Sequence, residues 1–175
     1  IEENKLANSL LFQGDEFNIE KTNFAALSKR SKESVINKNT NRNKTKKRFG
    51  KQVSIFAPAE FLVILKNKVT FLGGKWNEIN SLIGCTQFDH TNETFEKHKL
   101  NERNIKLSNG NIHTRDAHAA FNIKHAIVGC KDKLPESFNI HDMKKDYTNF
   151  CLLEKVEIDK HKNGKQTTKS MGIIN

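Results

Sequence analysis

Residues 115–123 read Arg-Asp-Ala-His-Ala-Ala-Phe-Asn-Ile, and this stretch decides how the rest of the chain is interpreted. Asp116 is predicted to be the N-cap of a helix, because its short carboxylate can accept hydrogen bonds from the backbone N–H groups of the first turn. A carboxylate fixed at a helix start can also serve as a metal ligand in phosphoryl chemistry. Mostly apolar residues then follow at helical spacing, namely Ala117, Ala120, Phe121, Lys124, Ile127 and Val128.

The same stretch resembles the third motif of the RuvC-like nuclease domain in TnpB proteins. These are the guide-RNA-directed endonucleases of insertion sequences, also known as OrfB-type transposases, and they are related to type V CRISPR effectors. In that family an Arg-Asp pair precedes an alanine-rich helix with an Asn-Ile-like pair, and the Asp is catalytic. The resemblance therefore implies that Asp116 is catalytic and that Arg115 orients it or contacts phosphate.

A second acid fits the same family. Alternation of Phe17 and Ile19 with polar residues predicts a short strand that ends near Glu20, with a helical segment beginning at Phe24. The family's second motif is a Glu that follows a strand, and residues 19–24 resemble it. RuvC-like nucleases hydrolyse DNA with paired divalent ions about 4 Å apart, which are held by carboxylates. The resemblance thus implies that Glu20 and Asp116 bind Mg²⁺ or Mn²⁺; the alternative for Glu20 is a surface glutamate at a helix start.

The family's first catalytic Asp, on an early strand, has no counterpart upstream of Glu20. The chain begins with Ile rather than Met, so we expect it to be the C-terminal part of a longer protein and to be inactive alone. The fold class implied is α/β, a partial RNase H-like (RuvC-like) domain with an inserted, cysteine-poor, ribbon-like loop region.

Positive charge dominates the chain, with a net charge of +10 and a pI near 9.5. Residues 28–51 contain ten Lys or Arg residues against the single acid Glu33. Such a run favours contact with nucleic acid, since neutralised phosphates release their counterions, although a solvated charged face is the usual meaning of basic runs. DNA and a guide RNA are the partners expected, with contacts from Arg115, Lys44, Lys46, Lys47, Arg48 and Lys51.

Between the two motifs many family members carry a zinc ribbon with two Cys-x-x-Cys pairs. This chain has Gln87-Phe88-Asp89-His90 near the first pair and Asn109-Gly110, a turn signal, near the second. Cys85, His90, His98 and His113 match no standard zinc spacing. We therefore expect no zinc, and we expect Gln87 and His90 to form hydrogen bonds within a metal-free loop. His118, His125 and His141 are expected to face solvent.

Four regions follow from these matches. Residues 1–83 are assigned to the RuvC-like part with the second carboxylate motif, the basic loop and a connecting helix. The helix is predicted from Pro58 to the Gly73-Gly74 stop, with an apolar stripe that includes Leu65, Val69 and Leu72, and a strand is predicted after it. Residues 84–113 form the degenerate ribbon-like insertion, residues 114–128 the third motif with its helix, and residues 129–175 a C-terminal tail.

Hydropathy and cysteine content indicate the compartment of the protein. No apolar run reaches the roughly 18–20 residues of a membrane span, and three cysteines without a close pair are typical of a reducing compartment. We expect a bacterial, cytoplasmic and nucleoid-associated protein without membrane contact. One alternative function is a nuclease-dead relative that binds DNA under RNA guidance and represses. A more distant one is a ribosomal or other RNA-binding protein.

Overall fold

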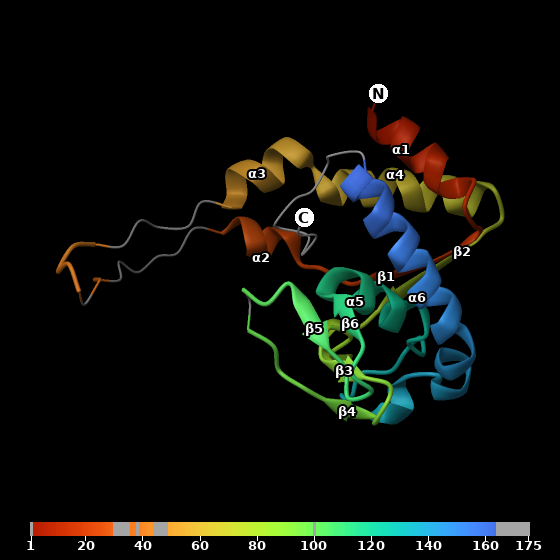
Figure 1. Ribbon diagram of the computed structural model, residues 1–175. Helices are drawn as coiled ribbons and strands as arrows, with labels where there is room; N and C mark the ends of the chain where they lie inside the picture. The colour runs from red at the N-terminus through yellow and green to blue at the C-terminus, as the bar shows by residue number, and fades with distance from the viewer. Residues whose placement is uncertain (1, 30–35, 38, 44–48, 100, 164–175) are drawn as a thin grey trace. The chain divides into compact units, whose positions relative to one another are not determined.

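The computed structural model describes residues 2–29, 36–37, 39–43, 49–99 and 101–163. The chain divides into two compact units. The first unit comprises Ile1–Phe17 and Thr22–Trp76, and the second comprises Asn18–Lys21 and Asn77–Asn175. Figure 1 shows their elements in chain order, from red to blue.

Helices make up most of the described first unit. They are α1 (Glu2–Leu11), α2 (Phe24–Ser28), α3 (Phe49–Phe56) and α4 (Pro58–Phe71). α1 packs against α4 around the fully buried side chains of Ala7, Leu65 and Val69. The helix α1 was not predicted, whereas the helical segment predicted at Phe24 is confirmed.

The long helix predicted from Pro58 is confirmed as α4. Pro58 occupies the first turn, where its missing N–H leaves no hydrogen bond unmade. The helix ends at its C-cap Leu72, and Gly73 follows with a φ of +77°, a conformation that glycine adopts without steric cost. Leu72, which we predicted on the buried stripe, is 67% exposed, because the helix has ended before it.

Two strands lead from the first unit into the second. β1 (Glu16–Glu20) pairs with β2 (Lys75–Ile79) in a two-stranded sheet. The Lys75 N–H donates to the Asp15 carbonyl near the start of both strands, and the Lys21 N–H donates to the Ile79 carbonyl at their ends. The strands therefore run parallel, joined by a helical crossover. The predicted strand at 17–20 is confirmed, whereas the one after Gly74 ends at Ile79, and residues 81–83 form a 3₁₀ turn, η1 (Ser81–Ile83).

Two hairpins and two helices form the second unit. The hairpins are β3 (Phe88–Asp89) with β4 (Thr94–Phe95) and β5 (Asn104–Lys106) with β6 (Ile112–Thr114), both antiparallel. The Asn109-Gly110 turn is confirmed between β5 and β6, with Gly110 at a φ of +88°. The helices are α5 (Arg115–Lys124) and α6 (Ile140–Asn163), with a 3₁₀ turn, η2 (Pro135–Ser137), between them.

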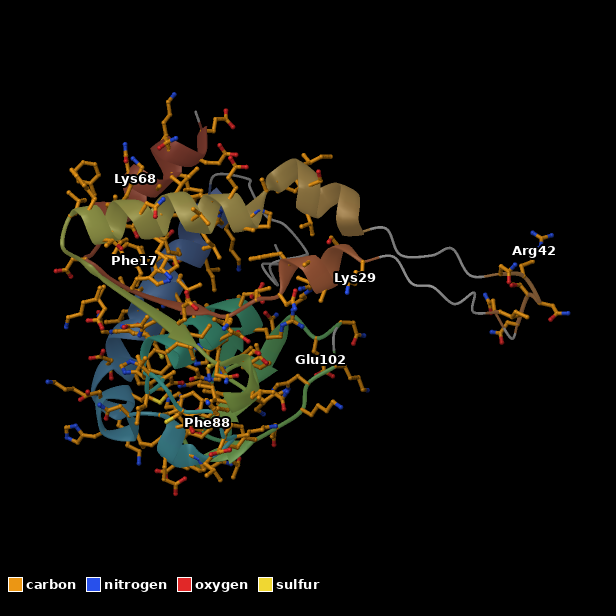
Figure 2. All side chains as sticks on the ribbon, turned by 180° about the vertical axis from the view of Figure 1, so that it is seen from behind. Phe17, Lys29, Arg42, Lys68, Phe88 and Glu102 are labelled. Atoms are coloured by element: carbon orange, nitrogen blue, oxygen red, sulfur yellow. The ribbon has the colours of Figure 1, made fainter. Side chains whose placement is uncertain are left out.

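Aromatic rings fill the core of the second unit. The Phe88 ring is fully buried and stacks on the Phe138 ring, with the ring centroids 4.2 Å apart. Figure 2 shows Phe88 surrounded by side chains of this unit. The other buried core residues are Ile79, Ile83, Cys85, Phe121, Ala126 and Met143.

The expected α/β class is confirmed in its coarse form, since the chain combines helices with short sheets. Among the described residues, no helix is both long and apolar enough to cross a membrane.

Candidate active site

Asp116 lies in the first turn of α5, where its carboxylate reaches solvent. Its side chain is 70% exposed, and Oδ1 lies 3.6 Å from Nε of Arg115, whose side chain is only 20% exposed. The helix begins at Arg115 and its N-cap is Thr114, so the prediction that Asp116 is the N-cap was wrong. Arg115 lies beside this carboxylate, and its role in orienting Asp116 stays a prediction.

The buried face of α5 also differs from the prediction. The helix ends at Lys124, with His125 as its C-cap, so Ile127 and Val128 lie beyond it and are exposed. Ala120 is exposed too. The face that packs inward carries His118, Ala119, Phe121 and Asn122.

Asn122 explains why this face points inward. Its side chain is fully buried, and Nδ2 donates to the carbonyl oxygens of Cys85 and Phe88, at 2.8 Å each. A buried carbonyl group requires a hydrogen-bond donor. Asn122 supplies this donor, in place of water, to one carbonyl just before β3 and to one within it. The Asn of the Asn-Ile pair thus joins α5 to the aromatic core.

Glu20 is the last residue of β1 and lies in the second unit with α5. Burial raises the pKa of its carboxyl group. Burial, with a smaller contribution from the Glu20 charge, raises the pKa of the Cys85 thiol to about 12. Glu20 is therefore the half-buried end of a strand and does not stand at a helix start.

A second contact joins β1 to α5. Asn18, two residues before Glu20, donates through Nδ2 to the Lys124 carbonyl at 2.9 Å and to the Ile123 carbonyl at 3.4 Å. Because side chains alternate along a strand, Glu20 shares the face of β1 that carries Asn18. Asp116 occupies the opposite end of α5, about 10 Å along the helix axis from Ile123 at 1.5 Å per residue. The two elements that bear the candidate acids therefore touch, at the C-terminal end of α5.

The candidate metal site consists of these two acids. In the ranges that the structure describes, no three His, Cys, Asp or Glu side chains gather in a way that could hold a metal ion. The donor chemistry still fits Mg²⁺, which is commonly bound through one or two carboxylates and completed by water and substrate phosphates.

Most of the residues predicted to contact nucleic acid are not among the described residues. Lys44, Lys46, Lys47 and Arg48 lie outside the described residues. Lys51 lies in α3, with its side chain outside the described part. Of this set, only the Arg115 side chain is placed, beside Asp116.

The second unit contains a cluster of buried histidines, His90, His118 and His125, that was not predicted. His118 and His125 are 1% and 7% exposed, so the prediction that they face solvent was wrong, whereas the His141 side chain is 89% exposed as expected. His90, predicted to form hydrogen bonds, is 1% exposed and neither ring nitrogen has a partner. Gln87 forms a side-chain hydrogen bond, but its Oε1 accepts from Lys133 Nζ at 2.6 Å, so the partner lies outside the predicted loop.

Burial controls the ionisation of these histidines. The centroids of the His90 and His118 rings lie 6.0 Å apart, and neither ring nitrogen of His118 has a partner. Burial, with a smaller contribution from neighbouring charged groups, lowers the pKa of His90 to about 4 and that of His118 to about 3. Both rings are therefore neutral at physiological pH. The available sequence signal was the position of His118, three residues before the buried Phe121 and four before Asn122.

Comparison of the chain with protein-family models, with curated proteins and with solved structures gives no match.

Proposed function

We propose that this chain is the C-terminal, RuvC-like part of a TnpB-type, RNA-guided DNA endonuclease, in which Asp116 and Glu20 bind Mg²⁺ or Mn²⁺ for phosphodiester hydrolysis. The observation that carries the proposal is the contact between β1 and α5 made by Asn18. This contact joins the two elements that bear the candidate acids, although these are far apart in the sequence.

Each acid has a distinct part in the proposed chemistry. Asp116 offers exposed carboxylate oxygens, with Arg115 beside them to fix their orientation. Glu20 comes from the half-buried end of a strand, on the face that meets α5. When bound, a divalent ion neutralises charge on the phosphate and lowers the pKa of its bound water. In the partial RNase H-like fold that we propose, the parallel pair β1–β2 and helix α5 supply the frame for these acids.

Nucleic-acid binding follows from the charge. A net charge of +10 suits a polyanionic partner. The basic stretch through Lys44, Lys46, Lys47, Arg48 and Lys51 would lie along the guide–target hybrid or the DNA strand. Arg115 would contribute either to phosphate binding or to the orientation of Asp116.

Metal binding by the chain itself tests the proposal most directly. We expect calorimetric titration with Mn²⁺ to show one or more sites, and Asp116→Asn and Glu20→Gln each to weaken the affinity at least tenfold. Asp159→Asn, an exposed acid on α6, is the matched control and should leave the affinity unchanged. Equal affinities for all four proteins would refute the assignment.

Cleavage by the intact protein with its guide RNA tests the enzymatic step. We expect Asp116→Asn to reduce the cleavage rate by more than a hundredfold while guide and target binding persist. Undiminished cutting would end the catalytic assignment of Asp116.

A nuclease-dead relative that binds DNA under RNA guidance is the second candidate. It requires only the net positive charge of the chain, +10, and no metal ion. It predicts target binding without cleavage in the intact protein, and no change in either when Asp116 is replaced.

A further inference from the structure

Glu154 of α6 holds the residues that lead into α5. Its Oε1 accepts hydrogen bonds from the Thr114 backbone N–H at 2.8 Å and from the Thr114 hydroxyl at 2.9 Å. Its Oε2 lies 2.6 Å from Nδ1 of His113. The side chains of His113 and Glu154 are only 4% and 8% exposed, so water competes little for these contacts.

The hydrogen bonds around this carboxylate extend through His113 to Tyr147. The side-chain Nδ2 atoms of Asn109 and Asn111 donate to the Tyr147 hydroxyl oxygen, at 3.3 and 2.9 Å. That hydroxyl lies 2.7 Å from Nε2 of His113 and also forms a hydrogen bond with the Cys151 side chain. An ionised carboxylate only accepts hydrogen bonds, so Nδ1 of His113 carries a proton and donates it to Glu154.

The ionised state of Glu154 agrees with this assignment. Burial by itself raises the pKa of Glu154, but the hydrogen bonds from His113 and Thr114 outweigh it, and the pKa lies below its ordinary value. A carboxylate that accepts three hydrogen bonds in a buried site is held in its charged form. Glu154 is thus a fixed anion, with its geometry determined from three directions.

The first turn of α5 depends on this anion. Thr114 is the N-cap residue, yet its side chain makes no capping hydrogen bond, and its hydroxyl donates to Glu154 instead. The next residue, Arg115, donates its backbone N–H to the Arg103 carbonyl at 2.7 Å. The helix start is therefore anchored by α6 and by the hairpin, and Asp116 follows directly after this anchor.

We propose that Glu154 is a positioning residue that fixes the start of α5 and thereby sets where the Asp116 carboxylate stands. This inference rests on the proposed function in one respect, namely that Asp116 binds a divalent ion. Glu154 itself does not touch the metal or the phosphate. His113 and Tyr147 act through Glu154, by keeping its second oxygen in place.

Glu154→Gln removes the negative charge of this side chain and keeps its size. The glutamine amide would present a donor to either Thr114 or His113, both of which already donate. If His113 changed tautomer to accept, its Nε2–H would compete with the two asparagines for the Tyr147 oxygen. We therefore expect glutamine to weaken the network. Glu154→Asp keeps the charge but is one methylene shorter, so it should restore part of the network.

The experiment compares these variants in the full 175-residue chain. Glu157→Gln is the matched control, since Glu157 lies on the same helix, exposed, and pairs with Lys160 at 2.6 Å. We expect Glu154→Gln to weaken Mn²⁺ affinity about tenfold with unchanged helix content, Glu154→Asp to recover part of the loss, and Glu157→Gln to bind as the unmodified chain does. Unchanged affinity in Glu154→Gln, while Asp116→Asn loses binding, would overturn the inference.

Amide hydrogen exchange tests the positioning without any metal. We expect the Thr114 amide and its neighbours through Asp116 to exchange at least tenfold faster in Glu154→Gln than in Glu157→Gln. If Asp116→Asn leaves Mn²⁺ binding unchanged, the proposed function fails, and the exchange result alone decides whether Glu154 fixes the helix start. Equal exchange rates in both variants would contradict the positioning role.

Discussion

The two units of this chain are built on opposite principles. The first unit buries three small or medium side chains, Ala7, Leu65 and Val69, and leaves Phe12 and Phe71 93% and 88% exposed. The second unit buries a stacked aromatic core together with polar side chains such as His90 and Asn122. Buried polar groups specify one arrangement of their neighbours when they are paired, and are costly when they are not. The paired Asn122 Nδ2 holds its neighbours in the second unit, which contains both candidate acids, in one arrangement, whereas the unpaired ring nitrogens of His90 cost that unit stability.

The chain contains one reporter for each unit. Trp76, its single Trp, packs against the α1–α4 core of the first unit, and Tyr147, its single Tyr, lies against the core of the second. Trp fluorescence and Tyr near-ultraviolet signals can therefore follow the two units separately.

Truncation of a phenylalanine in each unit should give the largest contrast. We expect Phe88→Ala to lower the free energy of unfolding by about 3–5 kcal/mol, because the ring is fully buried between Phe138 and Phe95 and its removal leaves a cavity. Phe71→Ala, the same substitution at an 88% exposed position, should change it by less than about 0.5 kcal/mol. Denaturant unfolding followed by both reporters measures the two values. Similar decreases in the free energy of unfolding in both variants would contradict the difference between the two units.

The buried histidines of the second unit should make the stability of that unit depend on pH. The folded-state pKa of His90 is lowered to about 4, chiefly by burial, against about 6.5 in an unfolded chain. Below pH 6.5 the unfolded state therefore takes up a proton that the folded state does not. Stability should fall by up to about 1.4 kcal/mol per pH unit between pH 6.5 and 4, and this contribution should level off below that.

A phenylalanine at this position provides the control. His90 is faced by Asp89 beside it, by His113 on β6, by His118 and His125 at α5 and by Lys144 and Tyr147 on α6. His90→Phe keeps an aromatic ring against Tyr147 and removes the proton uptake, so the slope measured by the Tyr147 signal should decrease. An unchanged slope between pH 4 and 6.5 would assign it to other groups, His118 foremost.

Local signals predicted much of the fold. Pro58 and Gly73 delimit α4, alternation marks β1, and Asn109-Gly110 marks a hairpin, because each depends on the conformational limits of nearby residues. The β3–β4 hairpin was not predicted, because the sequence around it is polar and irregular. The parallel pairing of β1 with β2 was not predicted either, since it depends on contacts between residues distant in sequence.

In the candidate site, the identity of the functional residues was easier to predict than the environment of their side chains. Asp116 and Glu20 were identified from motifs, and whether they share an ion stays a prediction. The environment of His118 was predicted wrongly, because a histidine in a helix gives no indication of burial until the helix is docked. The role of Glu154 had no sequence signal, since its partners His113 and Thr114 lie some forty residues away. Only the docking of α6 brings these groups together.

A pair of glycines should give the smallest contrast, and it examines the first unit. A Cβ added to Gly74, at the start of β2, would lie 2.5 Å from the Asp15 carbonyl oxygen and 3.0 Å from Cγ1 of Val69. Because the closest contact is backbone that pairs with Lys75, neither group can move away freely, and Gly74→Ala should destabilise the chain by about 1–3 kcal/mol. A Cβ on Gly14 would meet nothing within 4 Å, so Gly14→Ala should be neutral or slightly stabilising. The Trp76 signal reports both values, and a tolerated alanine at position 74 would mean that the junction of α4 with β2 is as loosely packed as the exposed surface around Phe71.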